Sequence, residues 1–88
     1  MLRDIIYVKS ELKYVEIYTK DKKFVLRHSL SDFINLLPEK EFIQVHRSYA
    51  VNKGFVDYIG PNYLKVSGNE VPYSLQRKEE LIKAFNFL

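Results

Sequence analysis

The stretch FIQVHRSYAVNKGFVDYIG, residues 42–60, decides how this sequence is interpreted. Most of its apolar side chains are of the kind found in protein interiors, yet His46, Arg47 and Ser48 sit together among them. Arginine is almost never fully buried unless it is paired. If Val45 points into the core from a strand, alternation sends Arg47 the same way. Two alternatives are therefore open: a carboxylate pairs with Arg47 inside the fold, or the strand ends near Val45 and Arg47 projects from a turn.

The composition predicts one domain, residues 1–88, built on a single core. The chain has 88 residues, of which 47% are hydrophobic. It has no cysteine, which excludes disulfides and thiolate–metal sites and fits a cytoplasmic location. No apolar run approaches the roughly 20 residues of a membrane span, and the N-terminus is too charged for a signal peptide. We therefore expect no membrane partner.

Alternating and apolar segments predict a mainly β fold. In residues 13–20, Val15 and Ile17 alternate with polar or aromatic neighbours, and this segment with residues 23–29 predicts a hairpin. A second hairpin turn is expected at residues 67–70, where Gly68 and Asn69 tolerate a positive φ. Pro72 places the strand that follows at a sheet edge. The predicted strands are residues 4–10, 13–20, 23–29, about 42–46, 55–59, 63–66 and 70–73.

Two helices are expected. Residues 29–40 predict a short helix of two turns, with Ser29 as the N-cap and Pro38 as the stop signal. Residues 74–88 predict a C-terminal helix capped by Ser74. Its apolar stripe consists of Leu81, Ile82, Phe85 and Leu88.

Nothing in the sequence favours an enzyme. The chain has no phosphate-loop, dinucleotide-binding or HExxH motif. His28 and His46 lie in separate predicted strands, with no carboxylate spaced to complete a metal site. We expect no cofactor and no metal, and we interpret His46 as a hydrogen-bonded structural residue.

Two further segments carry cations that could bind an anionic ligand. Arg77 and Lys78 fall in the first turn of the predicted last helix, where the helix dipole disfavours positive charge. Two interpretations are open. Either the two cations are exposed and destabilise the helix little, or they lie beside a phosphate bound at the helix N-terminus. The polar connection KSELKY, residues 9–14, carries Lys9 and Lys13. These segments would form one surface if the fold brings them to one edge.

The order and spacing of three segments resemble the LytTR-type DNA-binding domain of bacterial transcription regulators. They are FIQVHRSYAVN, the preceding DIIYVKSELKYVEIYTKDKKFVLRHSLSDFINLLP and the closing VPYSLQRKEEL. The resemblance implies an elongated stack of small antiparallel sheets with short helices, which reads double-stranded DNA through loops. The contacts that it implies are Lys13, Tyr14, Arg47, Gln76 and Arg77, with Lys9 and Lys78 near phosphates. On this interpretation Arg47 stands at the edge of the core.

The resemblance also suggests what surrounds the domain. Such domains often follow a phospho-receiver domain in a two-component response regulator, and a dimer on paired DNA sites is compatible with this arrangement. They usually begin one strand earlier, so the chain is expected to be trimmed there. Leu75 and Gln76 depart from the family, which often carries arginine at these positions. The alternatives are a small β-rich protein-interaction module with Arg47 paired internally, and an RNA-binding module.

Overall fold

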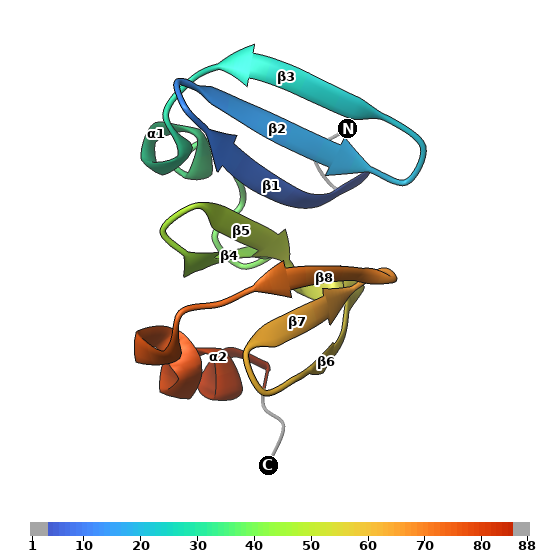
Figure 1. Ribbon diagram of the computed structural model, residues 1–88, viewed down its shortest axis with the longest axis vertical. Helices are drawn as coiled ribbons and strands as arrows, with labels where there is room; N and C mark the ends of the chain where they lie inside the picture. The colour runs from blue at the N-terminus through green and yellow to red at the C-terminus, as the bar shows by residue number, and fades with distance from the viewer. Residues whose placement is uncertain (1–3, 86–88) are drawn as a thin grey trace.

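Across residues 4–85, which the computed structural model describes, eight strands form two antiparallel sheets (Figure 1). The first sheet has the order β3-β2-β1-β5-β4, and the second has the order β6-β7-β8. The molecule measures 37 × 25 × 21 Å, so the predicted elongated stack of small sheets with two helices is confirmed. The strands are β1 (Ile5–Glu11), β2 (Tyr14–Thr19), β3 (Lys23–Arg27), β4 (Phe42–His46), β5 (Tyr49–Asn52), β6 (Val56–Ile59), β7 (Tyr63–Val66) and β8 (Asn69–Pro72).

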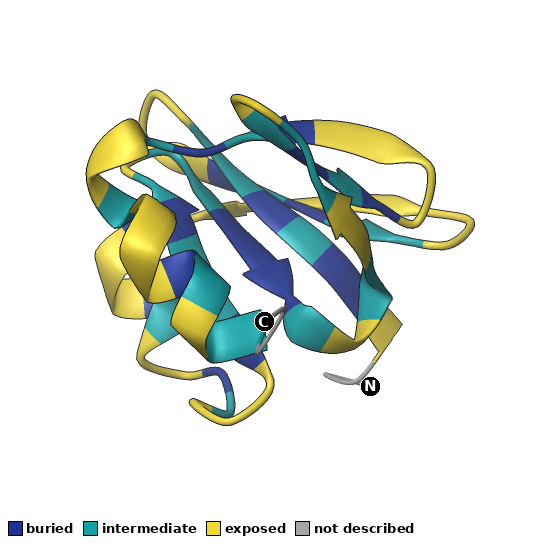
Figure 2. Cartoon of the chain, turned by 90° about the horizontal axis from the view of Figure 1, so that it is seen from below, coloured by how far each residue is buried: buried dark blue, intermediate teal, exposed yellow. Residues whose placement is uncertain are grey.

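A bulge in β1 lets this central strand serve two cores. Its register against β2 shifts between Ile5 and Tyr7, so an extra residue is inserted there. Ile5 and Val8 consequently belong to one core, whereas Ile6 and Tyr7 pack with the other. Figure 2 shows the resulting pattern, with the buried parts of the strands enclosed by exposed turns.

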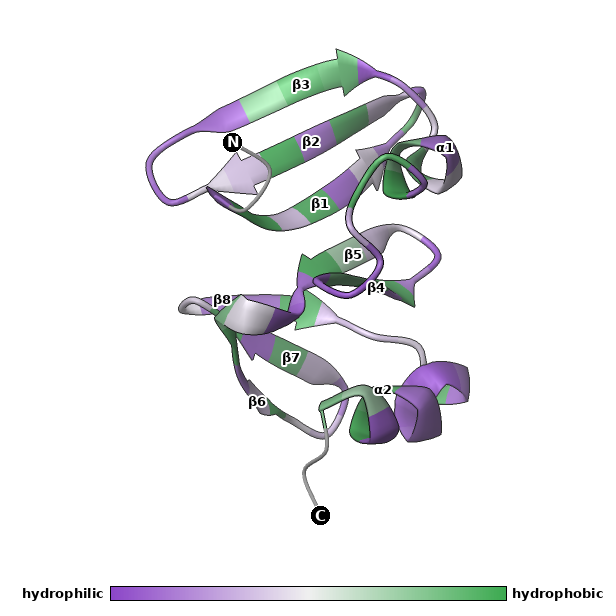
Figure 3. Ribbon diagram, turned by 180° about the vertical axis from the view of Figure 1, so that it is seen from behind, coloured by the Kyte–Doolittle hydropathy of each residue, from purple (hydrophilic) through white to green (hydrophobic). Residues whose placement is uncertain are grey.

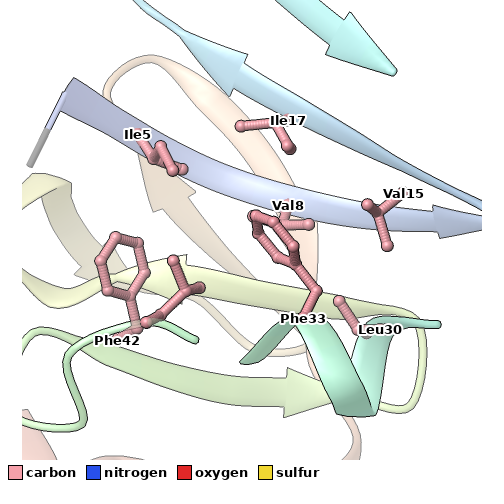
Figure 4. Packing of buried hydrophobic residues seen from close by; sticks show 8 residues of the cluster. Ile5, Val8, Val15, Ile17, Leu30, Phe33 and Phe42 are labelled. Carbon is pink, nitrogen blue, oxygen red and sulfur yellow. The ribbon is translucent and has the colours of Figure 1, made fainter. Parts of the chain in front are cut away.

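The first core lies between the five-stranded sheet and α1 (Leu30–Ile34). Ser29 caps this helix, because its hydroxyl accepts a hydrogen bond from the Asp32 N–H at 3.2 Å, as the sequence predicts. The helix is shorter than expected, but Leu37 remains buried beyond its end. Figure 4 shows Leu30 and Phe33 of the helix facing the apolar side chains of the sheet.

The second core lies between the other face of that sheet, the three-stranded sheet and α2 (Lys78–Phe85). Leu64, Val66 and Val71 of the smaller sheet and Leu81 of α2 are completely buried there. Figure 3, seen from behind, shows hydrophobic segments alternating with polar ones along β1, β2 and β7. Within the described part of the chain, no helix is long and apolar enough to cross a membrane.

The strand β5, which joins the two halves of the first sheet, is absent from the strands predicted from the sequence. It pairs with β1 on one side and with β4 on the other. The side chain of Asn52 is buried at its end, where it donates to the Ile5 carbonyl and accepts from the Gly54 N–H, both at 2.9 Å. This amide links β5 to β1 and starts the short 3-10 turn η2 (Lys53–Phe55) before β6.

The turn predicted at residues 67–70 needs correction. The β7–β8 turn places Ser67 and Gly68, rather than Gly68 and Asn69, at positive φ values of 47° and 86°. Val66 pairs with Asn69, so Ser67 and Gly68 form the whole two-residue loop of the hairpin. The prediction that Pro72 lies in an edge strand is confirmed, because β8 is the last strand of its sheet.

Candidate nucleic-acid interface

Arg47 is exposed in the turn between β4 and β5. The register of β4 against β5 explains why Arg47 lies outside the core although Val45, two residues earlier, is completely buried. Gln44 pairs with Ala50 and His46 with Tyr49, so Val45 is an extra residue in a bulge and alternation is broken there. Within residues 4–85, the Arg47 side chain makes no hydrogen bond or ion pair. The alternative in which Arg47 is paired inside the fold is therefore wrong.

The backbone around Arg47 is held on both sides. The ring of His46 accepts a hydrogen bond at Nδ1 from the Ser48 N–H, at 3.1 Å. The Gln44 side-chain amide donates to the His46 carbonyl at 3.1 Å. On the other side, the Ser10 N–H donates to the Ser48 carbonyl at 2.8 Å. The prediction that the His46 side chain is hydrogen-bonded within the fold is confirmed.

The β1–β2 turn presents Lys13 and Tyr14. Leu12 adopts a φ of 56° and is 92% exposed, and Lys13 beside it is also exposed. Tyr14 opens β2 with 44% of its surface exposed. It pairs across the strands with Arg27 of β3, so the side chains of both lie on the same face of the sheet. Arg27 was absent from the sequence-based candidates, because only strand register places it beside Tyr14.

The segment before α2 differs from the helix predicted for residues 74–88. Residues Leu75–Arg77 form the 3-10 turn η3, and the α-helix begins at Lys78. Ser74 is the N-cap of η3, but its side chain makes no capping hydrogen bond. The first turn of α2 carries Glu79 and Glu80, as the helix dipole favours.

The side chains of this segment also differ in what they contact. Gln76 and Lys78 are exposed. Arg77 is half-buried: its Nη1 lies 3.4 Å from the Gln44 carbonyl oxygen and 3.8 Å from a carboxylate oxygen of Glu80. In the predicted stripe, Leu81 is buried and Ile82 and Phe85 are half-buried, and Leu88 lies outside the described residues.

The three segments meet along one side of the molecule, which we call the loop edge: residues 12–14, 47–48 and 74–78. Hydrogen bonds hold the strands that carry these segments together: the Ser10 N–H of β1 donates to the Ser48 carbonyl, and the Ser74 N–H donates to the Val45 carbonyl of β4 at 2.9 Å. In Figure 1 both turns and the start of the last helix lie on the left, and in Figure 3 on the right. The β4–β5 hairpin is the middle member of this edge.

The loop edge carries exposed positive charge. Lys13, Arg47 and Lys78 are exposed cations, and the β3 end at Arg27 lies beside the first turn. Of the acids nearby, Glu11 lies 3.9 Å from Lys9 and Glu80 lies 3.8 Å from Arg77, whereas Glu79 has no ion pair within residues 4–85. Within the described residues, no three His, Asp or Glu side chains gather to hold a metal. Exposed cations on turns are typical of a surface that binds an anionic partner, rather than of a metal site or an active site.

Comparisons with known proteins agree with this arrangement. The model of the LytTr DNA-binding domain family matches residues 1–86. LytT of Bacillus subtilis, a sensory transduction protein, is 32% identical over 87 residues, covering 92% of this chain. The transcriptional regulatory protein YpdB of Escherichia coli is 29% identical over 86 residues. A solved LytTr DNA-binding domain from Bacillus cereus superposes with a TM-score of 0.87 at 26% identity, covering 98% of this chain and 84% of that one.

The chain thus belongs to the LytTr DNA-binding domain family. It spans 36% of the length of LytT and 35% of the length of YpdB. This is a DNA-binding family, and exposed cations are compatible with such a partner. DNA presents a dense row of phosphates, and proteins position themselves on it through such cations.

Proposed function

We propose that this domain reads double-stranded DNA in a sequence-specific way through the loop edge, in the control of transcription. The observation that carries the proposal is Arg47, an exposed arginine at the tip of a hairpin whose backbone is fixed on both sides. Its side chain has no hydrogen-bond or ion-pair partner among residues 4–85. A guanidinium held in this way can donate two hydrogen bonds to guanine O6 and N7 in the major groove.

The other residues of the loop edge take supporting roles. Lys13 and Lys78 contact phosphates, as does Lys9 of β1, which sets the orientation of the domain without reading sequence. Tyr14 packs on a sugar or donates its hydroxyl to a phosphate. Arg27, on the same face as Tyr14, adds a phosphate contact to that side.

Gln76 and Arg77 of η3 contact different parts of the DNA. Neighbouring side chains of a 3-10 turn diverge by about 120°, so the two cannot face the same feature of DNA. Gln76 is exposed and suits adenine N6 and N7. Arg77 turns back toward Gln44 and Glu80, which leaves it to contact a phosphate at the groove wall.

The chain would be the output domain, residues 1–88, of a longer cytoplasmic response regulator. YpdB is named a transcriptional regulatory protein, and a Vibrio cholerae relative that is 34% identical over 62 residues is named a response regulatory protein. A phospho-receiver domain would precede it, and two copies would bind paired sites on DNA.

A binding selection on randomised duplexes, followed by fluorescence anisotropy at two salt concentrations, tests the proposal. We expect one enriched half-site, tighter binding to it than to scrambled duplex, and affinities that fall with salt for both. A protein-interaction module would enrich no sequence. An RNA-binding module would prefer the single-stranded RNA copy of the site to the duplex.

A further inference from the structure

We propose that His46 is a positioning residue for DNA recognition, acting through the hydrogen bond that its ring accepts from the Ser48 N–H. This inference rests on the proposed function of Arg47. The hydrogen bond joins a side chain to the backbone two residues later, so it closes a ring of which Arg47 is the central residue. Within residues 4–85, the Arg47 side chain forms no hydrogen bond or ion pair that could fix the turn.

The hydrogen bond from the Ser48 N–H to the His46 ring resembles the one that closes an Asx turn, which Asn and Asp side chains usually form. Asn and Asp stabilise turns by accepting a hydrogen bond from the N–H two residues later. In His46 the imidazole Nδ1, which is bonded to Cγ as the side-chain oxygen of Asn is, takes that place at 3.1 Å. Because a backbone N–H can only donate, Nδ1 must be unprotonated and the proton must sit on Nε2.

Other contacts fix the ring and the rest of the turn. The His46 ring stands edge-on against Tyr49, with centroids 5.6 Å apart and planes at 76°. The His46 carbonyl accepts from Gln44, and the Ser48 carbonyl accepts from Ser10. The ring contact with Ser48 completes the set on the inner side of the turn. We infer that it presents the Arg47 backbone in one conformation, so that binding DNA need not order it.

Two substitutions separate the acceptor from the ring. His46→Phe keeps an aromatic ring against Tyr49 but has no acceptor, whereas His46→Asn keeps an acceptor on Cγ and loses the ring. We expect His46→Phe to weaken binding to the selected duplex by about three- to tenfold, the usual range for one lost hydrogen bond. His46→Asn should stay within about twofold. Equal losses in the two variants would overturn the proposal.

A double-mutant cycle tests whether His46 acts through Arg47. Residues that act as a unit are not additive. In the Arg47→Ala background, His46→Phe should therefore cost no further affinity. An undiminished loss in that background would show that His46 contacts DNA by itself, which contradicts a positioning role.

Two DNA-independent measurements keep the test separate from the proposed function. Ring nitrogen shifts of the wild-type protein, measured by NMR at neutral pH, should show the Nε2–H tautomer of His46, and the Nδ1–H tautomer would overturn the proposal even if the variants fail to fold. Amide exchange of Ser48 should accelerate in His46→Phe and not in His46→Asn. If it does so while Arg47→Ala binds DNA like the wild type, the role proposed for Arg47 fails and the effect of His46 on the turn stands.

Discussion

The carbonyl oxygen of Val45 accepts a hydrogen bond from the backbone N–H of Ser74, 2.9 Å away. Val45 is the bulged residue of β4, with its side chain completely buried, two positions before the exposed Arg47. The bulge therefore does two things at once. It frees Arg47 from the alternation of the strand, and it fixes the start of η3 beside the hairpin. The middle and last segments of the loop edge are positioned by this one residue.

The first prediction concerns salt. A domain that meets only a few phosphates should show a slope of log affinity against log salt of about −3 to −5 on one half-site. Lys13→Gln should flatten that slope by up to about one unit and weaken different sequences alike, because phosphate contacts carry no sequence information. Anisotropy titrations across a salt series measure both effects. Lys22→Gln, in the β2–β3 turn at the other end of the sheet, is the control, and equal effects of the two changes would remove Lys13 from the interface.

The second prediction concerns η3. Gln76→Ala should relax the preference at one base-pair position and change non-specific binding little. Arg77→Ala should weaken all sequences by a similar factor, most visibly at low salt. Binding selections with both variants decide the matter. If Arg77→Ala changes the preferred base and Gln76→Ala does not, the roles of the two residues are reversed.

The third prediction concerns stability at the β1–β2 turn. Leu12 adopts a φ of 56°, a conformation that costs an ordinary L-residue about 1–2 kcal/mol. Its side chain is 92% exposed, so little burial is lost on truncation. Leu12→Gly should raise the free energy of unfolding by about 0.5–1 kcal/mol, after the greater freedom of glycine in the unfolded chain is subtracted.

Urea denaturation checks this change against Leu36→Gly. Leu36 is also exposed, at 63%, and is not among the described residues with a positive φ. Leu36→Gly should therefore destabilise the protein. Destabilisation by both substitutions would mean that Leu12 is not strained.

The fourth prediction concerns alkaline pH. The Tyr18 hydroxyl donates to a carboxylate oxygen of Glu16 at 2.6 Å, and this hydrogen bond raises the pKa of Tyr18 above its ordinary value. A raised pKa in the folded state gives stability that is fully present below about pH 10, the pKa of unfolded tyrosine, and is lost as pH rises further. The stability difference between the wild type and Tyr18→Phe should therefore stay constant up to about pH 9 and shrink as the pH rises above about 10, the pKa of unfolded tyrosine.

Denaturation at each pH measures that difference. Tyr14→Phe is the matched control, because Tyr14 lies in the same strand and its hydroxyl has no hydrogen-bond partner within residues 4–85. A Tyr18→Phe difference that shrinks no more than the Tyr14→Phe difference over this pH range would contradict the assigned hydrogen bond.

The elements that the sequence predicted well are those marked by a pattern within the segment itself, such as alternation or a capping residue. The alternation around Val15 and Ile17 predicted β2, and the Ser29 cap predicted the start of α1. β5 was missed because its four residues follow a polar turn and carry no alternation long enough to distinguish them. Its place in the sheet is set by pairing with β1, which lies about forty residues earlier in the chain.

The candidate site was predictable by residue type but not by geometry. Sequence alone left Arg47 between a buried pair and an exposed turn, because the bulge at Val45 is a property of strand pairing. The same holds for Arg27, which reaches Tyr14 only through the β2–β3 register. The start of α2 was placed too early because a 3-10 turn has the same capping residues and a similar composition.

The most direct test of DNA recognition by the loop edge is the Arg47→Ala variant, assayed for binding and stability together. As an exposed contact to a base, Arg47 should contribute about 1–3 kcal/mol to binding of the selected duplex. Anisotropy should show that loss together with relaxed preference at one base pair, the melting temperature should stay nearly unchanged, and Lys22→Ala should bind normally. Unchanged affinity and base preference for Arg47→Ala, in a protein that is still folded, would contradict recognition through this hairpin.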